Sequence, residues 1–476
     1  MSDTRVLFAA SEVYPFAKSG GLADVAYSLP RALNETYDVD VIMPLYQFID
    51  RDAFGIEALG ETFDILMGER VYHVTLYICK YKNMTYRFVY TPLLCDRAYL
   101  YGPPQGGYAD NDIRFALFNH AMLEILKREP YDFVHLNDWQ TALLPLLLKN
   151  EPKIAVKSLF TIHNLAYQGI FEKKALDRLG IDKKYFHMDC LEFYGQVNFM
   201  KAGIAFADRI TTVSPTYAKE ILTPEFGCGL EGFLQYHSAK LTGIVNGIDT
   251  EQFSPSSDKM LVTPYRDLRG KEANKSAFLK EIKMKEPQRP LIIFIGRFTW
   301  QKGLEIFIDA LPDMALMECN IVVLGDGEAQ YHDALEALAK KHDNIYLESG
   351  YDEALSHRMY AASDFFLMPS LFEPCGLAQM IAMHYGSMPI VHSVGGLADT
   401  VHDHAAFDSQ SKKGYGIVFA KPDQDAFLDA VTKALQLYGR KTQYTQIVKH
   451  NMQCDFSWRE SGELYIKEYK KLEEES

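Results

Sequence analysis

Residues 20–24 read Gly-Gly-Leu-Ala-Asp, and the same five residues return at 395–399. In each copy the glycines stand where a loop enters a helix, so a ligand can approach backbone that carries no side chain. The free amides and the positive end of such a helix favour an anion such as a phosphate, and Lys18 adds a mobile positive charge. A chance match of two ordinary helix starts is the alternative. One copy in each half of the chain favours a two-lobed anion site.

The chain of 476 residues is too long for one hydrophobic core and predicts two large domains. Hydrophobic residues make up 48% and charged residues 24%, which is typical of a globular protein. There are 63 acidic residues against 49 basic ones, so long-range attraction to nucleic acid or to an anionic membrane is not expected. An anionic ligand would need locally placed cations.

The N-terminus enters an apolar stretch at 5–10, which leaves no room for a secretion signal, and no apolar run reaches the length of a membrane span. These features predict a cytoplasmic protein that does not bind membranes. The seven cysteines show neither a Cys-x-x-Cys pair nor a His/Cys cluster at zinc spacing. Neither disulfides nor a structural metal are expected.

Short apolar segments alternate with helical stretches, which is typical of parallel sheets covered by helices on both faces. Strands are expected at 6–10, 39–43, 133–136, 158–162 and 209–213 in the first half, and at 291–295, 320–324, 344–347, 365–368 and 389–392 in the second. Segments 71–79 and 85–91 alternate like an antiparallel insertion. The pattern predicts an α/β protein with two Rossmann-like doubly wound domains facing across a cleft.

A turn-rich stretch at 246–258 separates the two strand series and predicts the domain boundary. We therefore expect a first domain at 1–245 and a second at 246–456. The pattern beyond Asp423 is helical, and an amphipathic segment at 457–476 could return across the first domain.

Polar residues directly follow several expected strands, and ligands in open α/β sheets bind at the carboxyl ends of strands. Arg297 and Lys302 follow strand 291–295. A planar guanidinium and a flexible ammonium suit the oxygens of a diphosphate. An exposed cation pair at a helix start is the usual alternative.

Three further residues stand at strand ends. Glu373 can grip sugar hydroxyls or cap a helix, and His163 can lie beside a sugar or be a satisfied core histidine. Asp138 can likewise bind a ligand or cap the following helix. The convergence of all these residues at strand ends favours one shared site.

As a set, these residues resemble the bacterial glycogen synthase and plant starch synthase family of glycosyltransferases. The resemblance is carried by Lys18-Ser19-Gly20-Gly21-Leu22-Ala23-Asp24-Val25, His163 to Gly169, Ser214-Pro215-Thr216-Tyr217, Asn246-Gly247-Ile248-Asp249, Gln301-Lys302-Gly303, Glu373-Pro374-Cys375-Gly376-Leu377, Gly395 to Thr400 and Asp455-Phe456-Ser457-Trp458. It covers essentially the whole chain.

The resemblance implies a two-Rossmann enzyme that moves glucose from ADP-glucose to the non-reducing 4-hydroxyl of an α-1,4-glucan and retains the anomeric configuration. A nucleotide sugar and the glucan are then its partners, and neither a cofactor nor a metal is implied. UDP-glucose as the donor and a non-catalytic glucan-binding protein are the alternatives.

The resemblance also implies roles for individual residues, with the acceptor side in the first domain and the donor side in the second. It assigns catalysis to His163, Arg297, Lys302, Glu373 and Asp138. It assigns donor binding to Lys18, Gly20, Gly21, Asp24, Asn246, Tyr351, Cys375, Gly376, Leu377, Gly395 and Gly396, with Tyr351 stacked on the base. Asp138 and Tyr101 lie on the acceptor side in this comparison.

The chain departs from the family pattern at three positions. Ser19 replaces a threonine, Asn137 stands where a histidine often precedes the Asp-Trp pair, and Ala378 lacks the hydroxyl that relatives place near the distal phosphate. A dinucleotide-binding dehydrogenase is a poor alternative, because the segment 325–330 has Gln330 where the third glycine of the motif belongs.

Overall fold

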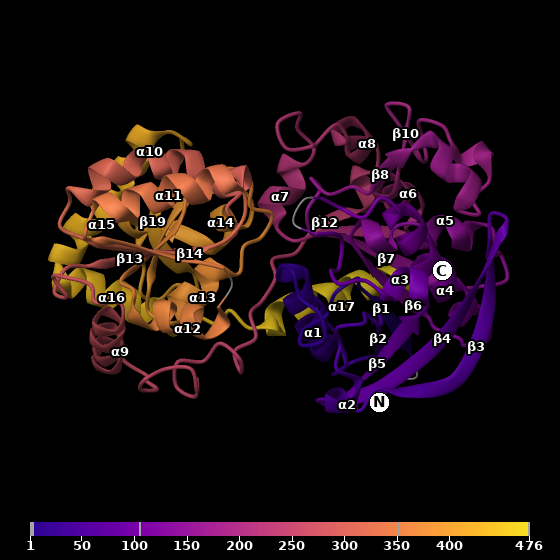
Figure 1. Cartoon of the computed structure of the whole chain (residues 1–476), viewed down its shortest axis with the longest axis horizontal. Coiled ribbons are helices and arrows are strands. Elements are labelled where there is room, and N and C mark those ends of the chain that lie inside the picture. The colour runs from indigo at the N-terminus through magenta and orange to yellow at the C-terminus, as the bar shows by residue number, and fades with distance from the viewer. Residues whose placement is uncertain (1–3, 104–105, 351, 475–476) are drawn as a thin grey trace. The chain divides into compact units, whose positions relative to one another are not determined.

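The structure is a computed structural model that describes residues 4–103, 106–350 and 352–474. The chain divides into two compact units, Met1–Asn246 with Trp458–Ser476 and Gly247–Ser457. Each unit contains its own largely parallel sheet with helices on both sides (Figure 1). The predicted class, α/β with two doubly wound domains, is confirmed.

The described residues of the first unit form a nine-stranded sheet. In sheet order its strands are β12 (Leu241–Gly243), β11 (Arg209–Thr212), β7 (Lys157–Ile162), β6 (Phe133–Asn137), β1 (Arg5–Ala9), β2 (Asp38–Pro44), β5 (Met84–Tyr90), β4 (Arg70–Tyr81) and β3 (Glu57–Met67). Strands β12 to β5 are parallel, and β4 runs antiparallel to β5 and β3. The expected antiparallel pair is therefore present, but it extends the main sheet because β5 also pairs with β2.

A small antiparallel sheet in the same unit consists of β8 (Ile170–Glu172), β10 (Gln196–Asn198) and β9 (Glu192–Phe193). The helices of this unit are α1 (Gly21–Leu33), α2 (Arg51–Phe54), α3 (Pro92–Cys95), α4 (Asn111–Arg128), α5 (Leu144–Lys149), α6 (Phe199–Phe206), α7 (Pro215–Glu220), α8 (Glu231–Tyr236) and α17 (Trp458–Glu474).

The described part of the second unit forms a seven-stranded parallel sheet. Its order is β15 (Ile345–Ser349), β14 (Asn320–Gly325), β13 (Leu291–Ile295), β16 (Phe365–Met368), β17 (Met388–His392), β19 (Gly414–Phe419) and β18 (Val401–Asp403). The helices are α9 (Leu268–Glu281), α10 (Leu304–Ala315), α11 (Ala329–Lys341), α12 (Glu353–Ala362), α13 (Ala378–His384), α14 (Gly395–Thr400), α15 (Gln424–Gly439) and α16 (Lys441–Asn451). Figure 1 shows α10 and α11 on one face of this sheet and α12 and α13 on the other.

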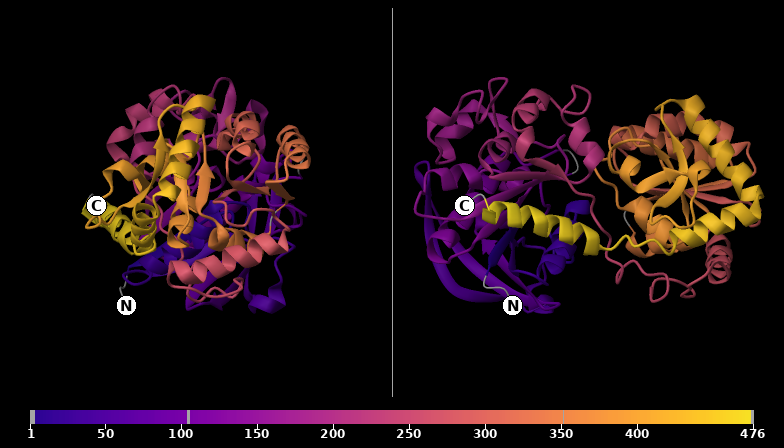
Figure 2. Two further views of the ribbon diagram at one scale, coloured as in Figure 1. Left: turned by 90° about the vertical axis from the view of Figure 1, so that its left-hand side faces the viewer. Right: turned by 180° about the vertical axis from the view of Figure 1, so that it is seen from behind.

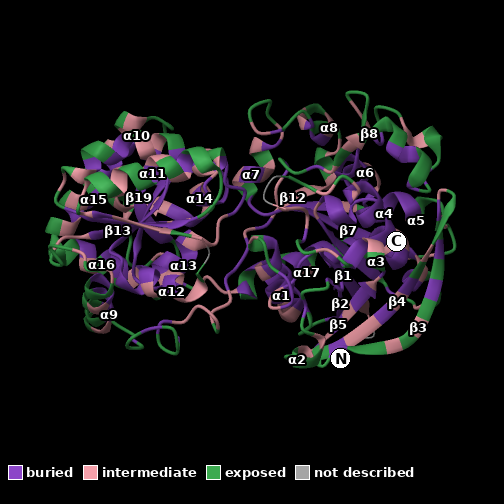
Figure 3. Cartoon of the chain, viewed as in Figure 1, coloured by how far each residue is buried: buried purple, intermediate pink, exposed green. Residues whose placement is uncertain are grey.

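Burial explains why the central strands read as unbroken apolar runs. Four of the five residues of β13 are buried, because helices cover both faces of a parallel sheet. Phe294 of β13 stacks on Phe307 of α10, with ring centroids 5.5 Å apart. Figure 3 shows this layering as buried strands between helices whose outer faces are exposed.

Each sheet reverses its strand order at one point. In the first unit the chain passes from β1 to β2, reaches β3 at the edge of the sheet and comes back through β4 to β5. It then crosses to β6 on the other side of β1. In the second unit it runs from β13 through β14 to β15 and returns to β16 beside β13. The crevice outside the carboxyl ends of the strands at such a reversal is where doubly wound proteins bind ligands.

Helix α17 belongs to the first unit although it ends the chain (Figure 2). Its buried residues Trp458, Tyr465, Tyr469 and Leu472 recur at helical spacing and form one face. The Tyr469 hydroxyl lies 2.8 Å from Nδ1 of the buried His135 in β6. The last segment of the chain thus contributes to the core beneath the strand that carries Asn137.

Most of the strands that sequence reasoning missed are at edges or contain glycine, and β10 is too short, with three residues, to give a signal. Edge strand β3 carries Gly60 and an irregular register against β4. Strand β19 contains Gly416, where a Cβ atom would lie 2.4 Å from the Pro389 carbonyl oxygen. Close packing between the strands therefore requires glycine here, and this glycine interrupts the apolar pattern by which a strand is predicted.

Candidate active site

Most of the residues proposed for catalysis follow the strands that flank the two reversals, and His163 follows β7, the neighbour of β6. Strand β1 leads to Ser11 and Glu12, and its neighbour β6 leads to Asn137 and Asp138. In the second unit, β13 leads to the Arg297–Lys302 segment and its neighbour β16 leads to the segment containing Glu373. Both units therefore place their polar residues where ligands of doubly wound sheets bind.

A buried carboxyl group organises the first glycine loop. Glu12, 4% exposed, accepts hydrogen bonds from the backbone N–H and the hydroxyl of Ser19. The Tyr101 hydroxyl donates to the same carboxylate at 3.3 Å and lies 2.7 Å from the Ser11 hydroxyl. Ser19 therefore uses its hydroxyl within the protein, and Tyr101 is held beside the loop.

The first glycine loop leads into α1, whose N-cap is Gly20. A Cβ atom at Gly20 would have no other atom of the protein within 4 Å, so no part of the protein covers the backbone at this position. The Lys18 ammonium forms an ion pair of 2.7 Å with Asp24 in the first turn of α1. An anion that binds Lys18 here must compete with this carboxylate.

Asn137 and Asp138 hold His163 from two sides. Asp138 has a φ of 56°, and its Oδ1 accepts the backbone N–H of His163 at 2.7 Å. Nε2 of the His163 ring lies 2.8 Å from Oδ1 of Asn137. The Asp138 side chain makes no capping hydrogen bond to the 3-10 helix Trp139–Thr141, so the capping alternative is wrong.

The loop after His163 is fixed by a neighbouring helix and a tryptophan. Ser214 caps α7 by accepting the Tyr217 N–H, and the Tyr217 hydroxyl accepts the Leu165 N–H at 3.0 Å. Gly169 has a φ of +65°, and a Cβ atom there would lie 2.4 Å from the Trp139 ring. These contacts explain the residues of two motifs of the sequence, 163–169 and 214–217.

Burial dominates the acidities in this unit. It raises the pKa of Asp138 to about 7, against the opposing effect of two backbone N–H donors, and the charge of Glu12 raises it further. Burial also raises the pKa of Glu12 to about 6 and lowers the pKa of His163 to about 3. The imidazole of His163 is therefore neutral near neutral pH.

In the second unit, the two candidate cations have different surroundings. Arg297 is exposed and its guanidinium makes no hydrogen bond or ion pair with any described residue. Lys302 instead forms an ion pair of 2.6 Å with Oε2 of Glu373. Gly303 follows with a φ of +67°, and a Cβ atom there would lie 2.0 Å from the Pro369 carbonyl oxygen.

Glu373 is held by two donors on one oxygen. Its Oε2 accepts Lys302 Nζ at 2.6 Å and the buried Ser370 hydroxyl at 2.9 Å, whereas Oε1 bonds to no described residue. Helix α13 has Leu377 as its N-cap, so Glu373 does not cap this helix. The carboxylate therefore presents Oε1 as a free acceptor.

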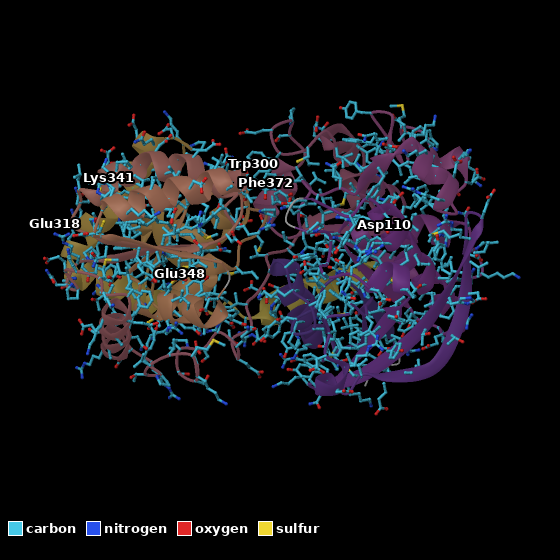
Figure 4. The ribbon with its side chains drawn as sticks, viewed as in Figure 1. Asp110, Trp300, Glu318, Lys341, Glu348 and Phe372 are labelled. Carbon is cyan, nitrogen blue, oxygen red and sulfur yellow. The ribbon has the colours of Figure 1, made fainter. Side chains whose placement is uncertain are left out.

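The Lys302 and Glu373 segments are also joined through their backbones. The Gln301 carbonyl accepts the N–H groups of Leu371 and Phe372. Trp300 and Phe372 lie at this edge of the unit, with ring centroids 6.4 Å apart (Figure 4). Trp300 is half exposed, which the sequence alone did not single out.

The second glycine loop differs from the first. The Gly396 N–H donates to the carbonyls of Glu373 and Pro374, so the expectation of a free amide there is wrong. A Cβ atom at Gly396 would lie 2.0 Å from the Cys375 carbonyl oxygen. Gly395, with a φ of 46°, begins α14 beside this contact. The same five residues thus form an open helix start in one unit and a packed one in the other.

The remaining candidates lie close to these segments or outside the described residues. Gly376 has a φ of +71°, and Gln379 donates to the carbonyls of Cys375 and Gly376, which fixes the turn before Leu377 and Ala378. Oδ1 of Asn246 is buried and has no hydrogen-bond partner within the described part of the chain. Tyr351 lies outside the described residues. Sequence reasoning missed Glu12 and Ser370, although both stand at strand ends, which was the available signal.

The described residues contain neither a candidate membrane span nor a candidate metal site. None of their helices combines the length and the apolar character of a membrane span. No group of three or more His, Cys, Asp or Glu side chains among them is placed to hold a metal ion.

Two doubly wound units with cations and a carboxylate at the strand reversals define a two-Rossmann glycosyltransferase. Residues 5–236 match the family model of the starch synthase catalytic domain, and residues 289–437 match that of glycosyl transferases group 1. The chain belongs to the glycogen synthase and starch synthase family of glycosyltransferases.

Individual relatives match over almost the full chain. A glycogen synthase of Aquifex aeolicus is 44% identical and one of Geotalea daltonii 40% identical, with 98% of this chain and at least 98% of each relative covered. The catalytic domain of starch synthase IV from Arabidopsis thaliana, solved with ADP and acarbose, is 34% identical with a TM-score of 0.91, and the match covers 98% of this chain and 99% of that one. A sucrose-phosphate synthase of Thermosynechococcus elongatus, 17% identical with a TM-score of 0.61, shows the fold alone.

Proposed function

We propose that this enzyme transfers glucose from ADP-glucose to the non-reducing 4-hydroxyl of an α-1,4-glucan with retention of configuration. The observation that carries the proposal is the Lys302–Glu373 ion pair beside the strand reversal of the second unit, together with Arg297 after the same strand as Lys302. It offers two cations for a diphosphate and one free carboxylate oxygen for a sugar hydroxyl. The glycogen synthase relatives and the ADP-bound starch synthase support this choice of substrates.

In this proposal the cations act on the leaving group. Breaking the bond between glucose and phosphate leaves negative charge on ADP, and fixed positive charges stabilise that change more in the transition state than in the ground state. Arg297 is free to bind the diphosphate directly, whereas Lys302 must share its charge between the phosphate and Glu373. Lys18 is proposed as a third cation, and Asn246, Tyr351, the Cys375–Leu377 turn and both glycine loops as the rest of the donor site.

The proposed sugar contacts come from Glu373 and His163. Oε1 of Glu373 accepts a glucose hydroxyl, because Ser370 and Lys302 already occupy Oε2. His163 lies beside the transferring glucose, and Asp138 and Tyr101 lie on the acceptor side. We also propose that the fixed cations take the place of a divalent metal, so that a chelator leaves turnover unchanged.

A donor panel tests the proposal. ADP-glucose and UDP-glucose are each supplied with glycogen, and nucleotide release and glucan lengthening are followed together. The proposal expects ADP release matched by new linkages that an α-1,4-specific hydrolase removes. A UDP-glucose preference overturns the donor assignment, and glucan binding without nucleotide release overturns the enzyme assignment.

A further inference from the structure

Asn137 is a buried side chain whose two polar atoms have different partners. It is fully buried at the carboxyl end of β6. Its Nδ2 donates to the Ala9 carbonyl at 2.9 Å, and its Oδ1 lies 2.8 Å from Nε2 of His163. The side chain thus connects β1, on one side of the strand reversal, to the histidine that follows β7.

These contacts determine where the proton of His163 sits. A carbonyl oxygen only accepts hydrogen bonds, so the amide nitrogen of Asn137 must face Ala9 and the amide oxygen must face the imidazole. That oxygen is also only an acceptor, so Nε2 of His163 must carry the hydrogen. A neutral imidazole has one N–H, and therefore Nδ1 is left as an acceptor.

The surroundings of the ring are consistent with a neutral imidazole. Burial lowers the pKa of His163 to about 3, and burial lowers the pKa of the neighbouring His135 as well. Asp138 contacts the backbone N–H of His163. Nδ1 of His163 makes no hydrogen bond with any described residue, so it is open to a ligand.

We propose that Asn137 is a positioning residue that fixes His163 in its Nε2–H form, so that Nδ1 can only accept a hydrogen bond from a hydroxyl of the bound sugar. The role of the sugar in this inference rests on the proposed function. The consequence for the reaction is specific: His163 orients a hydroxyl through Nδ1 and cannot serve there as a proton donor.

The proton position can be measured without any substrate. Nitrogen NMR of the full chain, deuterated and labelled at histidine, reports both ring nitrogens, and His163→Gln identifies the signals of His163 by their loss. We expect a protonated Nε2, an unprotonated Nδ1, and an Nε2–H proton protected from exchange with water. An Nδ1–H form or a charged ring at neutral pH overturns the inference, whatever the enzyme's activity.

Variants separate positioning from support of the fold. Asn137→Ala removes the acceptor, so the Nε2–H proton should lose its protection. Asn137→Asp keeps an oxygen opposite Nε2 but loses the donor to the Ala9 carbonyl, so it should preserve the protection and lower the melting temperature. Asn119→Ala is the matched control, because Asn119 is equally buried and binds the Phe115 and Gln140 carbonyls without touching His163. Its loss should lower the melting temperature and leave the His163 signals unchanged.

Kinetics then test the role of the positioned ring. We expect Asn137→Ala to lower kcat about tenfold or more, measured per folded enzyme at saturating donor, with a smaller change in KM. Asn119→Ala should stay within about twofold of the wild-type kcat. Equal kinetic effects of the two alanine variants, or a protected Nε2–H in Asn137→Ala, overturn the proposal. A negative donor panel would contradict the proposed function but not the position of the His163 proton, which the NMR experiment measures without substrate. The two inferences can therefore be contradicted independently.

Discussion

Because Lys302 and Glu373 form an ion pair, substituting one of them also changes the environment of the other. Lys302→Ala leaves a buried carboxylate with only the Ser370 hydroxyl as partner, and an uncompensated buried charge is destabilising. Arg297→Ala removes an exposed side chain without a described partner. We expect both changes to lower kcat by about 10²-fold or more, but only Lys302→Ala to lower the melting temperature as well. Near-normal turnover in both variants contradicts the proposed diphosphate site.

Glu373→Gln gives the complementary prediction. The amide keeps the shape of the side chain but removes the negative charge that Lys302 now balances. We therefore expect a strong fall in kcat, because the sugar contact weakens, together with ADP binding that is as tight as in the wild type or tighter. Calorimetry with ADP and saturated turnover on one preparation measure both. Weaker ADP binding with normal turnover would remove Glu373 from the sugar site.

The acids Glu12 and Asp138 should make the stability of the first unit fall with rising pH. Burial raises their pKa values to about 6 and about 7, above the unfolded values of about 4. Between the unfolded and folded pKa values the folded state holds more protons than the unfolded state, so the free energy of unfolding decreases as pH rises from about 4 to about 7.

The isosteric variants Glu12→Gln and Asp138→Asn should remove part of this slope, because an amide has no proton to lose. Denaturant unfolding at pH 5 and pH 8 measures the difference. The difference in the free energy of unfolding, variant minus wild type, should be more favourable to the variant at pH 8 than at pH 5. Parallel curves for variant and wild type would show that these carboxyl groups titrate normally.

Among the elements of the second unit, the turn that carries Lys302 depends on Gly303. Its φ of +67° favours glycine, and a Cβ atom would collide with the Pro369 carbonyl oxygen at 2.0 Å. Gly303→Ala should therefore displace the Lys302 segment from the Glu373 segment. We expect a loss of stability well above the 1–2 kcal/mol or so of the left-handed conformation alone, and a large loss of kcat.

Gly55→Ala is the matched control for Gly303→Ala. Gly55 ends α2 with a φ of +60°, but a Cβ atom there meets nothing within 4 Å. Its substitution should cost only about 1–2 kcal/mol in denaturant unfolding and leave kcat unchanged. If the two variants behave alike, the close approach to Pro369 is not what fixes the turn.

For the molecule as a whole, helix α17 ties the end of the chain to the unit that contains its beginning. Leu472 is fully buried on this helix, whereas Leu464 is 38% exposed. Leu472→Ala should cost about 2–5 kcal/mol through lost burial and a cavity, and Leu464→Ala less than about 0.5 kcal/mol. Differential scanning calorimetry of both variants checks this. Equal effects would mean that α17 does not complete the core of the first unit.

The local sequence predicted the elements whose signals are continuous along the chain. Strands β13 and β16 begin and end where their apolar runs do, because both faces of these parallel strands are buried. The polar residues after the strands were found for the same reason, since a strand end is visible in the sequence. Strands such as β19 were missed, because they contain glycine, which is typical of turns. The glycine is required by close packing against residues that are distant in the sequence.

The sequence by itself determined the two-domain α/β class, the family and the strand ends that carry the polar residues, because these depend on local periodicity and on contiguous motifs. Only the tertiary structure decided which polar atoms meet. Lys302 pairs with Glu373 across 71 positions of sequence, and His163 meets Asn137 across 26. It also made the two identical glycine segments different, because Gly21 is exposed whereas its counterpart Gly396 is buried against the Cys375 carbonyl. Burial, which sets the acidities of Glu12, Asp138 and His163, is likewise a property of the folded chain and not of its local sequence.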